Sequence, residues 1–282
     1  LFNSGLVPGV PSKGSVGASG DLAPLAHMAA TLIGEGELRR NGISEPAKAA
    51  LDAAGIPLFQ FAAKEGLAMA NGTQASLALA IEGLLQAESV FAGAVAAGAL
   101  SMEAALGQAS AFDSRIQEFR CQKGQIEIAA VYRSLLESSE IQELAKRDGR
   151  VQDPYSLRCQ PQVMGACLDF LRFGAEILTR EINAITDNPL FDPESGDLLY
   201  GGNFHAEPVG MAADTLALPI CEIGAMSERR IALLTDANHS KLPAFLAGES
   251  GLDSGFMVAQ VTAAALASEN KHLANPAGTD SI

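Results

Sequence analysis

Residues 74 to 111 read QASLALAIEGLLQAESVFAGAVAAGALSMEAALGQASA and contain no proline. Alanine and leucine dominate this stretch, and both are strong helix formers, so the pattern predicts one long helix that is largely buried. Four glycines lower its helix propensity but allow neighbouring helices to approach closely, namely Gly83, Gly93, Gly98 and Gly107. A helix of this length is typical of a protein built as a bundle of long helices.

Other segments fit the same architecture. Helical patterns lie at about 155 to 185, 208 to 235 and 253 to 273. Pro219 should kink or break the third of these segments. Turn residues occur at 187 to 189 and 193 to 197, where they predict a small hairpin, and residues 35 to 60 look like a short connecting excursion. The predicted fold class is mainly α, with long antiparallel helices and functional residues on the loops at helix ends.

The composition indicates a globular protein without a polyanionic partner. The 282 residues are 48% hydrophobic and 18% charged, with a net charge of -14. Phosphate binding needs clustered Lys and Arg, so nucleic acid and anionic membranes are not expected partners. The cysteines form no Cys-x-x-Cys pair and no two histidines have helical ligand spacing, which predicts neither a disulfide framework nor a metal site. We therefore expect a cytoplasmic protein.

The sequence gives no sign of a targeting or membrane segment. Residues 1 to 5 have neither a basic region nor a long apolar run, so they are not predicted to be a signal peptide. The longest uncharged helical run, residues 89 to 102, is shorter than the roughly 20 residues that cross a bilayer. We expect this run to be a buried helix of a soluble protein.

Residues 14 to 21 read GSVGASGD, a loop whose glycines permit sharp bends. By spacing alone, the loop is most simply the start of the helix that follows, with Asp21 or Ser19 as its cap and Pro24 in its permissive first turn. A phosphate-binding loop is less favoured. The pattern GxxxxGK[ST] is absent, and Asp21 would place a negative charge beside the phosphate.

Residues 14 to 27, GSVGASGDLAPLAH, resemble the signature of the aromatic amino acid lyase family. The resemblance implies that Ala18, Ser19 and Gly20 cyclise to a 4-methylidene-imidazol-5-one group, and that no diffusible cofactor or metal is needed. The residue types suit this chemistry. A glycine nitrogen can approach the Ala18 carbonyl closely because Gly20 has no Cβ, and the Ser19 hydroxyl can leave as water.

Residues 64 to 74, KEGLAMANGTQ, resemble a second segment of the family. Alone, they indicate only a helix start capped by Asn71 or Thr73. The resemblance implies that Asn71 lies in the active site, near the prosthetic group and the amino acid moiety of the substrate.

Residues 151 to 165, VQDPYSLRCQPQVMG, resemble the histidine-specific branch of the family most closely. The match implies that Arg158 binds the substrate carboxylate, a task suited to a planar bidentate donor that stays charged. It also implies that Gln152 and Tyr155 face the reactive ring.

Residues 201 to 208, GGNFHAEP, again resemble the histidine-specific branch. The match implies that Phe204 packs near the prosthetic ring. His205 and Glu207 could instead cap the helix that follows, and for His205 this structural role is as favoured as a functional one.

Together, these segments imply an enzyme that eliminates ammonia from L-histidine to give trans-urocanate. Two alternatives remain open: a tyrosine or phenylalanine lyase or an aminomutase of the same family, and a noncatalytic all-α scaffold. The resemblance also implies a fumarase-like helix bundle and a homotetramer in which each active site draws on several chains.

The resemblance extends over residues 1 to 282, which we expect to form part of a single lyase domain. The prosthetic-group loop would occupy residues 14 to 21 and the central bundle about 64 to 273. Family members place a catalytic tyrosine and a substrate-binding histidine before the segment matched here, and a glutamate that recognises imidazole after residues 275 to 282. We therefore expect this chain by itself to be an inactive internal fragment.

Overall fold

The computed structural model describes residues 1–147 and 150–280, so Ser281 and Ile282, the end of the segment resembling the family, lie outside the described residues. The chain is mainly helical and divides into two compact units. The first unit comprises Leu1–Ile81 and Ile177–Gly210, and the second comprises Glu82–Glu176 and Met211–Ile282.

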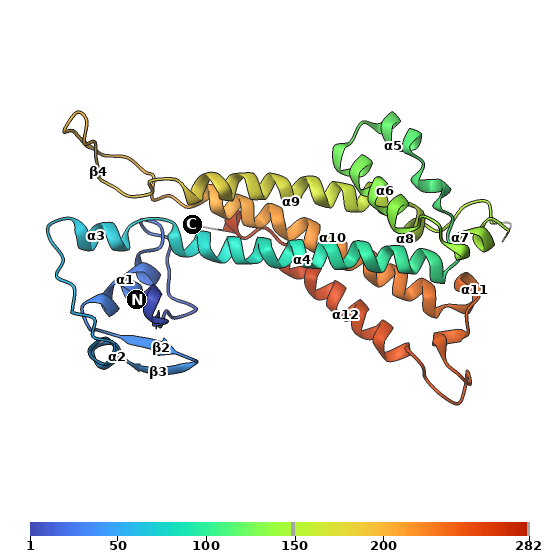
Figure 1. Ribbon diagram of the computed structural model, residues 1–282, viewed down its shortest axis with the longest axis horizontal. Helices are drawn as coiled ribbons and strands as arrows, with labels where there is room; N and C mark the ends of the chain where they lie inside the picture. Colours follow the sequence, from blue (N-terminus) through green and yellow to red (C-terminus); the bar gives the residue numbers. More distant parts are fainter. Residues whose placement is uncertain (148–149, 281–282) are drawn as a thin grey trace. The chain divides into compact units, whose positions relative to one another are not determined.

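The second unit contains the predicted bundle. Its long helices are α4 (Gln74–Ala104), α9 (Gln160–Ile182), α10 (Glu207–Thr235) and α12 (Met257–Leu273), of which the first three also contribute residues to the first unit. Successive long helices run in opposite directions (Figure 1). Buried apolar side chains from α4, α9 and α10 form one core, to which Met102, Met164 and Ile223 belong. The predicted antiparallel helical fold is confirmed.

Shorter helices complete the second unit. They are η2 (Ala109–Phe112), α5 (Ser114–Arg120), α6 (Lys123–Leu135), α7 (Glu140–Ala145), α8 (Tyr155–Arg158), α11 (Ala237–Ser240), η3 (Ala244–Leu246) and η4 (Gly278–Asp280). Tyr132 of α6 is fully buried, and its ring stacks on that of Phe112 with centroids 5.0 Å apart. This contact ties α6 and η2 to the core beneath α8.

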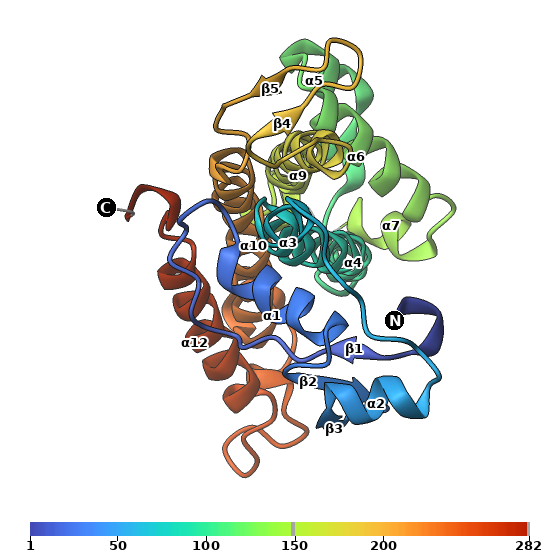
Figure 2. The same cartoon turned by 90° about the vertical axis from the view of Figure 1, so that its left-hand side faces the viewer.

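The first unit combines a small sheet with short helices. Strands β1 (Val7–Pro8), β2 (Glu37–Arg40) and β3 (Ile43–Pro46) form an antiparallel sheet in the order β1-β2-β3. Helix α2 (Ala47–Ala53) packs beside it (Figure 2). The remaining elements are η1 (Phe2–Ser4), α1 (Leu22–Leu32), α3 (Glu65–Ala70) and the hairpin of β4 (Leu190–Phe191) with β5 (Leu198–Leu199).

Several elements differ from the sequence-based expectations. Residues 35 to 60 contain two strands and a helix, held by a core that includes Leu38 and Leu51, where only a connection was expected. Helix α10 is continuous through Pro219, so of the predicted kink or break, the break does not occur. Packing against α9 maintains the helix there: the Pro219 carbonyl accepts the Cys167 thiol at 3.7 Å, and Leu216 lies against Gly174.

Helix α4 ends at Ala104 and is less buried than expected. Leu79 and Leu100 are 76% and 68% exposed. The expectation was wrong because a sequence pattern of alanine and leucine does not indicate which face of the helix another element covers. By length and composition, α4 and α10 are both apolar enough to cross a membrane, with 33% of each apolar stretch buried. Core helices of a bundle meet the same criterion, and both helices contribute to the core described above.

Candidate active site

The loop that ends in Ala18, Ser19 and Gly20 lies against two other segments of the first unit. Gly20 forms an isolated bridge with Gly72. A Cβ added to Gly20 would lie 2.2 Å from the Gly72 carbonyl oxygen and 2.5 Å from that of Phe204. The backbone is left-handed at both Ser19, with φ 51°, and Gly20, with φ 77°. Position 20 therefore admits only glycine, for a steric reason beyond the close approach to Ala18 expected from the sequence.

Asp21 joins this loop to the start of α4. Its carboxylate is 4% exposed and accepts hydrogen bonds from the Ser76 amide at 2.7 Å and the Ser76 hydroxyl at 2.5 Å. Its own amide donates to the Gly72 carbonyl at 2.8 Å. Asp21 occupies the N-cap position of α1, as predicted, but its side chain makes no capping hydrogen bond to that helix. The carboxylate instead accepts a hydrogen bond from an amide in the first turn of α4, where its negative charge also interacts favourably with the helix dipole.

The Asn-Gly-Thr-Gln segment, residues 71–74, is bonded to the chain around the end of α9. The Thr73 hydroxyl donates to Glu181 at 2.6 Å, and the Thr73 amide donates to the Thr186 hydroxyl at 3.4 Å. Asn71 also binds this part of the chain, as described next. Both side chains thus bind residues far away in the sequence, which the interpretation as a helix cap did not predict.

Asn71 is 2% exposed and its amide is held on one side only. Its Nδ2 donates to Asp187 Oδ1 at 2.9 Å and to the Asn188 carbonyl at 3.0 Å. Lys64 Nζ donates to both carboxylate oxygens of Asp187, at 2.9 and 2.8 Å. Asn71 Oδ1 is buried and accepts no hydrogen bond within the described parts of the chain. An acceptor is thus left available beside the bridge between Gly72 and Gly20.

The Asn-Phe-His-Ala-Glu segment has one residue at the loop and one at a helix start. Phe204 is half-buried, and its carbonyl oxygen is one of the two that face Gly20. His205 is exposed, and its Nδ1 accepts the Glu207 amide at 3.2 Å. This bond is the structural role considered for His205, that of capping the start of α10.

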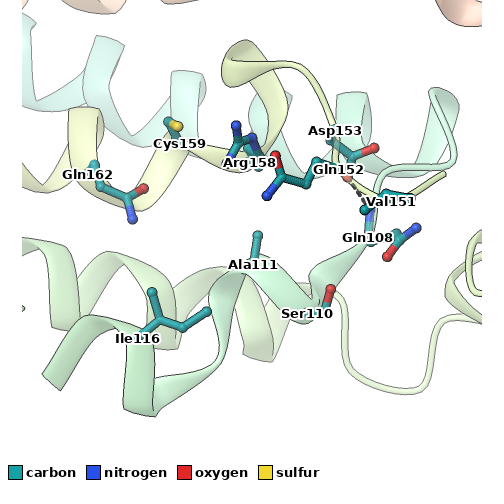
Figure 3. A pocket seen from close by; sticks show the side chains of 10 residues that line it. All are labelled: Gln108, Ser110, Ala111, Ile116, Val151, Gln152, Asp153, Arg158, Cys159 and Gln162. Carbon is teal, nitrogen blue, oxygen red and sulfur yellow. Dashed lines mark hydrogen bonds between the residues drawn. The ribbon is translucent and has the colours of Figure 1, made fainter. Parts of the chain in front are cut away.

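In the second unit, Gln152, Tyr155 and Arg158 gather around α8. The Arg158 guanidinium carbon lies 4.8 Å from the centre of the Tyr155 ring, within cation-π range. Gln152 and Arg158 line a cavity of about 280 Å³, together with Gln162 (Figure 3). Arg158 Nε and Gln162 Oε1 are buried and have no hydrogen-bond partner among residues 1–147 and 150–280. Two of the residues that line the cavity thus carry a buried polar atom without a described partner.

The loop before α8 is anchored by a buried carboxylate. Asp153 is 5% exposed, and it accepts the Gln108 amide at 2.6 Å and Arg150 Nη1 at 2.9 Å. Pro154 follows directly at the start of α8. The Asp-Pro pair therefore fixes where the helix begins, which sets the direction of Arg158 one turn later.

Gln160 anchors the other end of α8. It is fully buried, and its Nε2 donates to the Leu157 carbonyl at 3.1 Å. Its Oε1 accepts the Tyr132 hydroxyl at 3.0 Å and Arg230 Nη1 at 3.2 Å. Burial raises the pKa of Tyr132 to about 12, although Arg230 opposes the shift, so the phenol keeps its proton and remains a donor. The network holds α8 against α6 and α10.

The residues predicted from the sequence form two groups. Those in the first unit lie at or beside the Gly20 bridge: Ala18, Ser19, Gly20, Asn71 and Phe204. Those in the second unit lie on and before α8: Gln152, Tyr155 and Arg158.

The amino-acid sequence alone indicates no role for Lys64, Asp187 or Gln162. Asp187 was interpreted only as part of a turn, and Gln162 only as part of a matching segment. Asp-Asn-Pro is typical of turns, so its composition does not distinguish an exposed aspartate from one that binds a distant lysine. These residues stand out only in the tertiary structure. Lys64 and Asp187 form an ion pair across the first unit, and Gln162 Oε1 is buried without a described partner.

Comparisons with known proteins agree with this arrangement. The family model for aromatic amino acid lyases matches residues 1–282. The histidine ammonia-lyase of Aromatoleum aromaticum is 62% identical over all of this chain and 54% of its own length. The crystal structure of histidine ammonia-lyase from Trypanosoma cruzi has a TM-score of 0.91 and 42% identity, covering 100% of this chain and 53% of that one.

A tyrosine aminomutase structure from Streptomyces globisporus is also similar, with a TM-score of 0.92 and 35% identity, covering 100% of this chain and 56% of that one. The chain thus spans about half the length of the curated relatives it matches. The glycine-clamped loop, the bonded Asn-Gly-Thr-Gln segment and the full-length match agree, and the chain belongs to the aromatic amino acid lyase family.

Proposed function

We propose that this chain is part of a histidine ammonia-lyase, which eliminates ammonia from L-histidine and releases trans-urocanate. The observation that carries the proposal is the clamped Ala18-Ser19-Gly20 loop, where two backbone carbonyls exclude any side chain at position 20. Identity of 58% to 62% with histidine ammonia-lyases over the whole chain supports histidine as the substrate.

The residues at the loop suit a 4-methylidene-imidazol-5-one group formed from Ala18, Ser19 and Gly20. The missing Cβ at Gly20 and the left-handed backbone at Ser19 favour the tight turn that ring closure needs. When formed, the group supplies an electrophile to a reaction in which ammonium is a poor leaving group and the β-proton is weakly acidic. Ser19 is the residue whose hydroxyl must leave.

The remaining residues bind and orient the substrate in this proposal. Arg158 holds the carboxylate, because its guanidinium stays charged and its buried Nε has no other described partner. Asn71 presents Oδ1 to the amine. Tyr155 keeps the Arg158 side chain in place through its ring, and Gln152 lines the same cavity.

We extend the proposal to the assembly of the complete protein. Both units would belong to a single lyase domain, with the loop at 14 to 21 and the bundle at about 64 to 273, in a homotetramer located in the cytoplasm. The many exposed apolar side chains on α4 and α12 support burial by further protein. The lack of a Cys-x-x-Cys pair in the sequence and the similarity to histidine ammonia-lyases support the location.

Ser19→Ala in the full-length protein provides the test. Urocanate formation from L-histidine should disappear, since the variant lacks the hydroxyl that leaves, and the helical circular dichroism should be unchanged. Mass spectrometry of the peptide containing residues 18 to 20 should find loss of water in the parent protein and none in the variant. Ser12→Ala, an exposed change in the same loop, is the matched control and should retain both activity and dehydration.

The product distinguishes the alternatives. Cinnamate or coumarate from phenylalanine or tyrosine would indicate another lyase of the family, and a β-amino acid would indicate an aminomutase. An intact, unmodified Ser19 in a folded full-length protein without turnover would indicate a noncatalytic scaffold, and the proposal would be wrong.

A further inference from the structure

The amide of Asn71 has only one orientation that its neighbours accept. Asp187 Oδ1 and the Asn188 carbonyl lie 2.9 and 3.0 Å from Nδ2, and both are acceptors. Rotating the amide by half a turn would place Oδ1 against two oxygens and lose both hydrogen bonds. The contacts therefore point the NH2 group at Asp187 and direct the oxygen away from it.

Lys64 secures the other side of the same carboxylate. Its Nζ contacts both oxygens of Asp187, at 2.9 and 2.8 Å, and the Asn188 carbonyl at 3.3 Å. The pair joins the residue before α3 to the chain after α9, and Lys64 adopts a left-handed conformation with φ 75° to reach it. The three side chains thus form a continuous row from Lys64 through Asp187 to Asn71.

The row keeps Asp187 ionised. Burial raises the pKa of this carboxyl, but hydrogen bonds from Lys64, from Asn71 and from the Asn188 amide together lower it below its usual range. An ionised carboxylate can only accept hydrogen bonds, whereas a protonated one could donate to the amide oxygen. By keeping Asp187 ionised, the charge of Lys64 helps to keep Asn71 Nδ2 facing Asp187 and Oδ1 facing away from it.

We propose that Lys64 and Asp187 are positioning residues that make Asn71 a fixed hydrogen-bond acceptor for the amine of an amino acid substrate. The inference rests on the proposed function, and adds to it the residues that select the amine. Asn71 Oδ1 is buried and accepts nothing from the described residues, which leaves it available to an N–H donor. A ligand without an amine would gain nothing from the same orientation.

The test compares two ligands on the full-length enzyme. L-histidine carries the amine, and 3-(imidazol-4-yl)propanoate is the same molecule without it. In Lys64→Met, the KM for L-histidine should rise about 3- to 10-fold, the worth of one ordinary hydrogen bond, while the inhibition constant of the amine-free ligand stays unchanged. Lys64→Arg keeps the charge and should restore the parent KM.

Two controls separate positioning from a general loss of structure. Lys48→Met removes a lysine from an exposed ion pair with Asp52 in the same unit and should change neither constant. Each rate is divided by the fraction of the protein in which residues 18 to 20 have lost water. If Lys64→Met folds poorly, the neutral donor in Lys64→Gln should give a smaller change in the same direction.

The outcomes are distinct. An equal rise in both constants, or a Lys64→Arg variant no better than Lys64→Met, would overturn the role of the lysine while leaving the proposed function intact. A parent enzyme that releases no urocanate would overturn the proposed function, and this inference with it.

Discussion

Arg158 combines a guanidinium against the Tyr155 ring with a buried Nε that donates to no described residue. Lysine in its place would keep the charge but lose the planar fork and the stacking. We expect Arg158→Lys in the full-length enzyme to lower kcat/KM for L-histidine by about 10- to 150-fold, which corresponds to about 1.5 to 3 kcal/mol for a charged hydrogen bond. Arg172→Lys, at an exposed pair with Glu127, should have little effect. Unchanged kcat/KM in Arg158→Lys would show that another residue binds the carboxylate.

The cysteines should differ in reactivity. Burial, followed by the nearby Glu222, raises the pKa of the Cys167 thiol to about 12, whereas Cys121 is exposed. Because the thiolate is the reactive form, iodoacetamide at pH 8 should modify Cys121 and leave Cys167 unmodified until the protein is unfolded. Peptide mass spectrometry gives the extent at each site. Equal labelling of the two sites in folded protein would contradict the burial of Cys167 beneath α10.

At the scale of elements, Gly98 determines how closely α4 meets its neighbours. A Cβ there would lie 2.1 Å from Gln160 Oε1 and 2.6 Å from the Tyr132 hydroxyl, and both groups are fixed in the buried network. We expect Gly98→Ala to destabilise the protein by about 1 to 3 kcal/mol through overpacking. Because the same network anchors α8, kcat/KM should fall as well.

Gly93 is the matched control for that prediction. It lies in the same helix, and a Cβ there meets no described atom within 4 Å. Gly93→Ala should be neutral or stabilising by up to about 1 kcal/mol, since alanine favours the helix. Thermal unfolding of both variants beside the parent protein provides the measurement. If the Gly98→Ala protein were as stable as Gly93→Ala, α4 could move away from Gln160 and Tyr132 without a loss of stability, and the prediction would be wrong.

At the scale of the whole molecule, the 282-residue chain leaves much apolar surface uncovered. Leu100 on α4 and Val258, Val261 and Leu273 on α12 are each 60% exposed or more. Surfaces of this kind drive association when they are not covered by other protein. We expect the chain expressed alone to elute from size-exclusion chromatography as mixed oligomers or aggregates, whereas the full-length protein should elute as one species.

The same chain should also lack turnover. It spans about half the length of its curated relatives. The family resemblance implies that the catalytic tyrosine lies before the matched segment, and a general base typically raises the rate by about 10²- to 10⁴-fold. Urocanate absorbance with L-histidine, followed beside the full-length protein at equal concentration, measures the difference. Turnover at a comparable rate by the chain alone would contradict the prediction and would make Tyr155 the best candidate for the base.

The helical class, the candidate loop and most of the candidate residues could be predicted from the amino-acid sequence. The presence of a long helix follows from local properties, since a proline-free run rich in alanine and leucine favours the helical conformation. Its end does not, because the run continues to residue 111 and α4 ends at Ala104. The Ala18-Ser19-Gly20 loop and Arg158 could be proposed because their segments resemble a family closely. The prediction of the hairpin near residue 190 rested on turn residues that act within a few positions.

The hydrogen-bond partner of each polar side chain could be identified only in the folded protein. Asp21 directly precedes α1, yet its carboxylate binds the start of α4, and Asn71 binds Asp187 across the first unit. Helix α10 passes through Pro219 because α9 packs against it. Each case has one physical reason: hydrogen bonds and close packing depend on distances between residues far apart in the chain, and these distances exist only after the chain has folded.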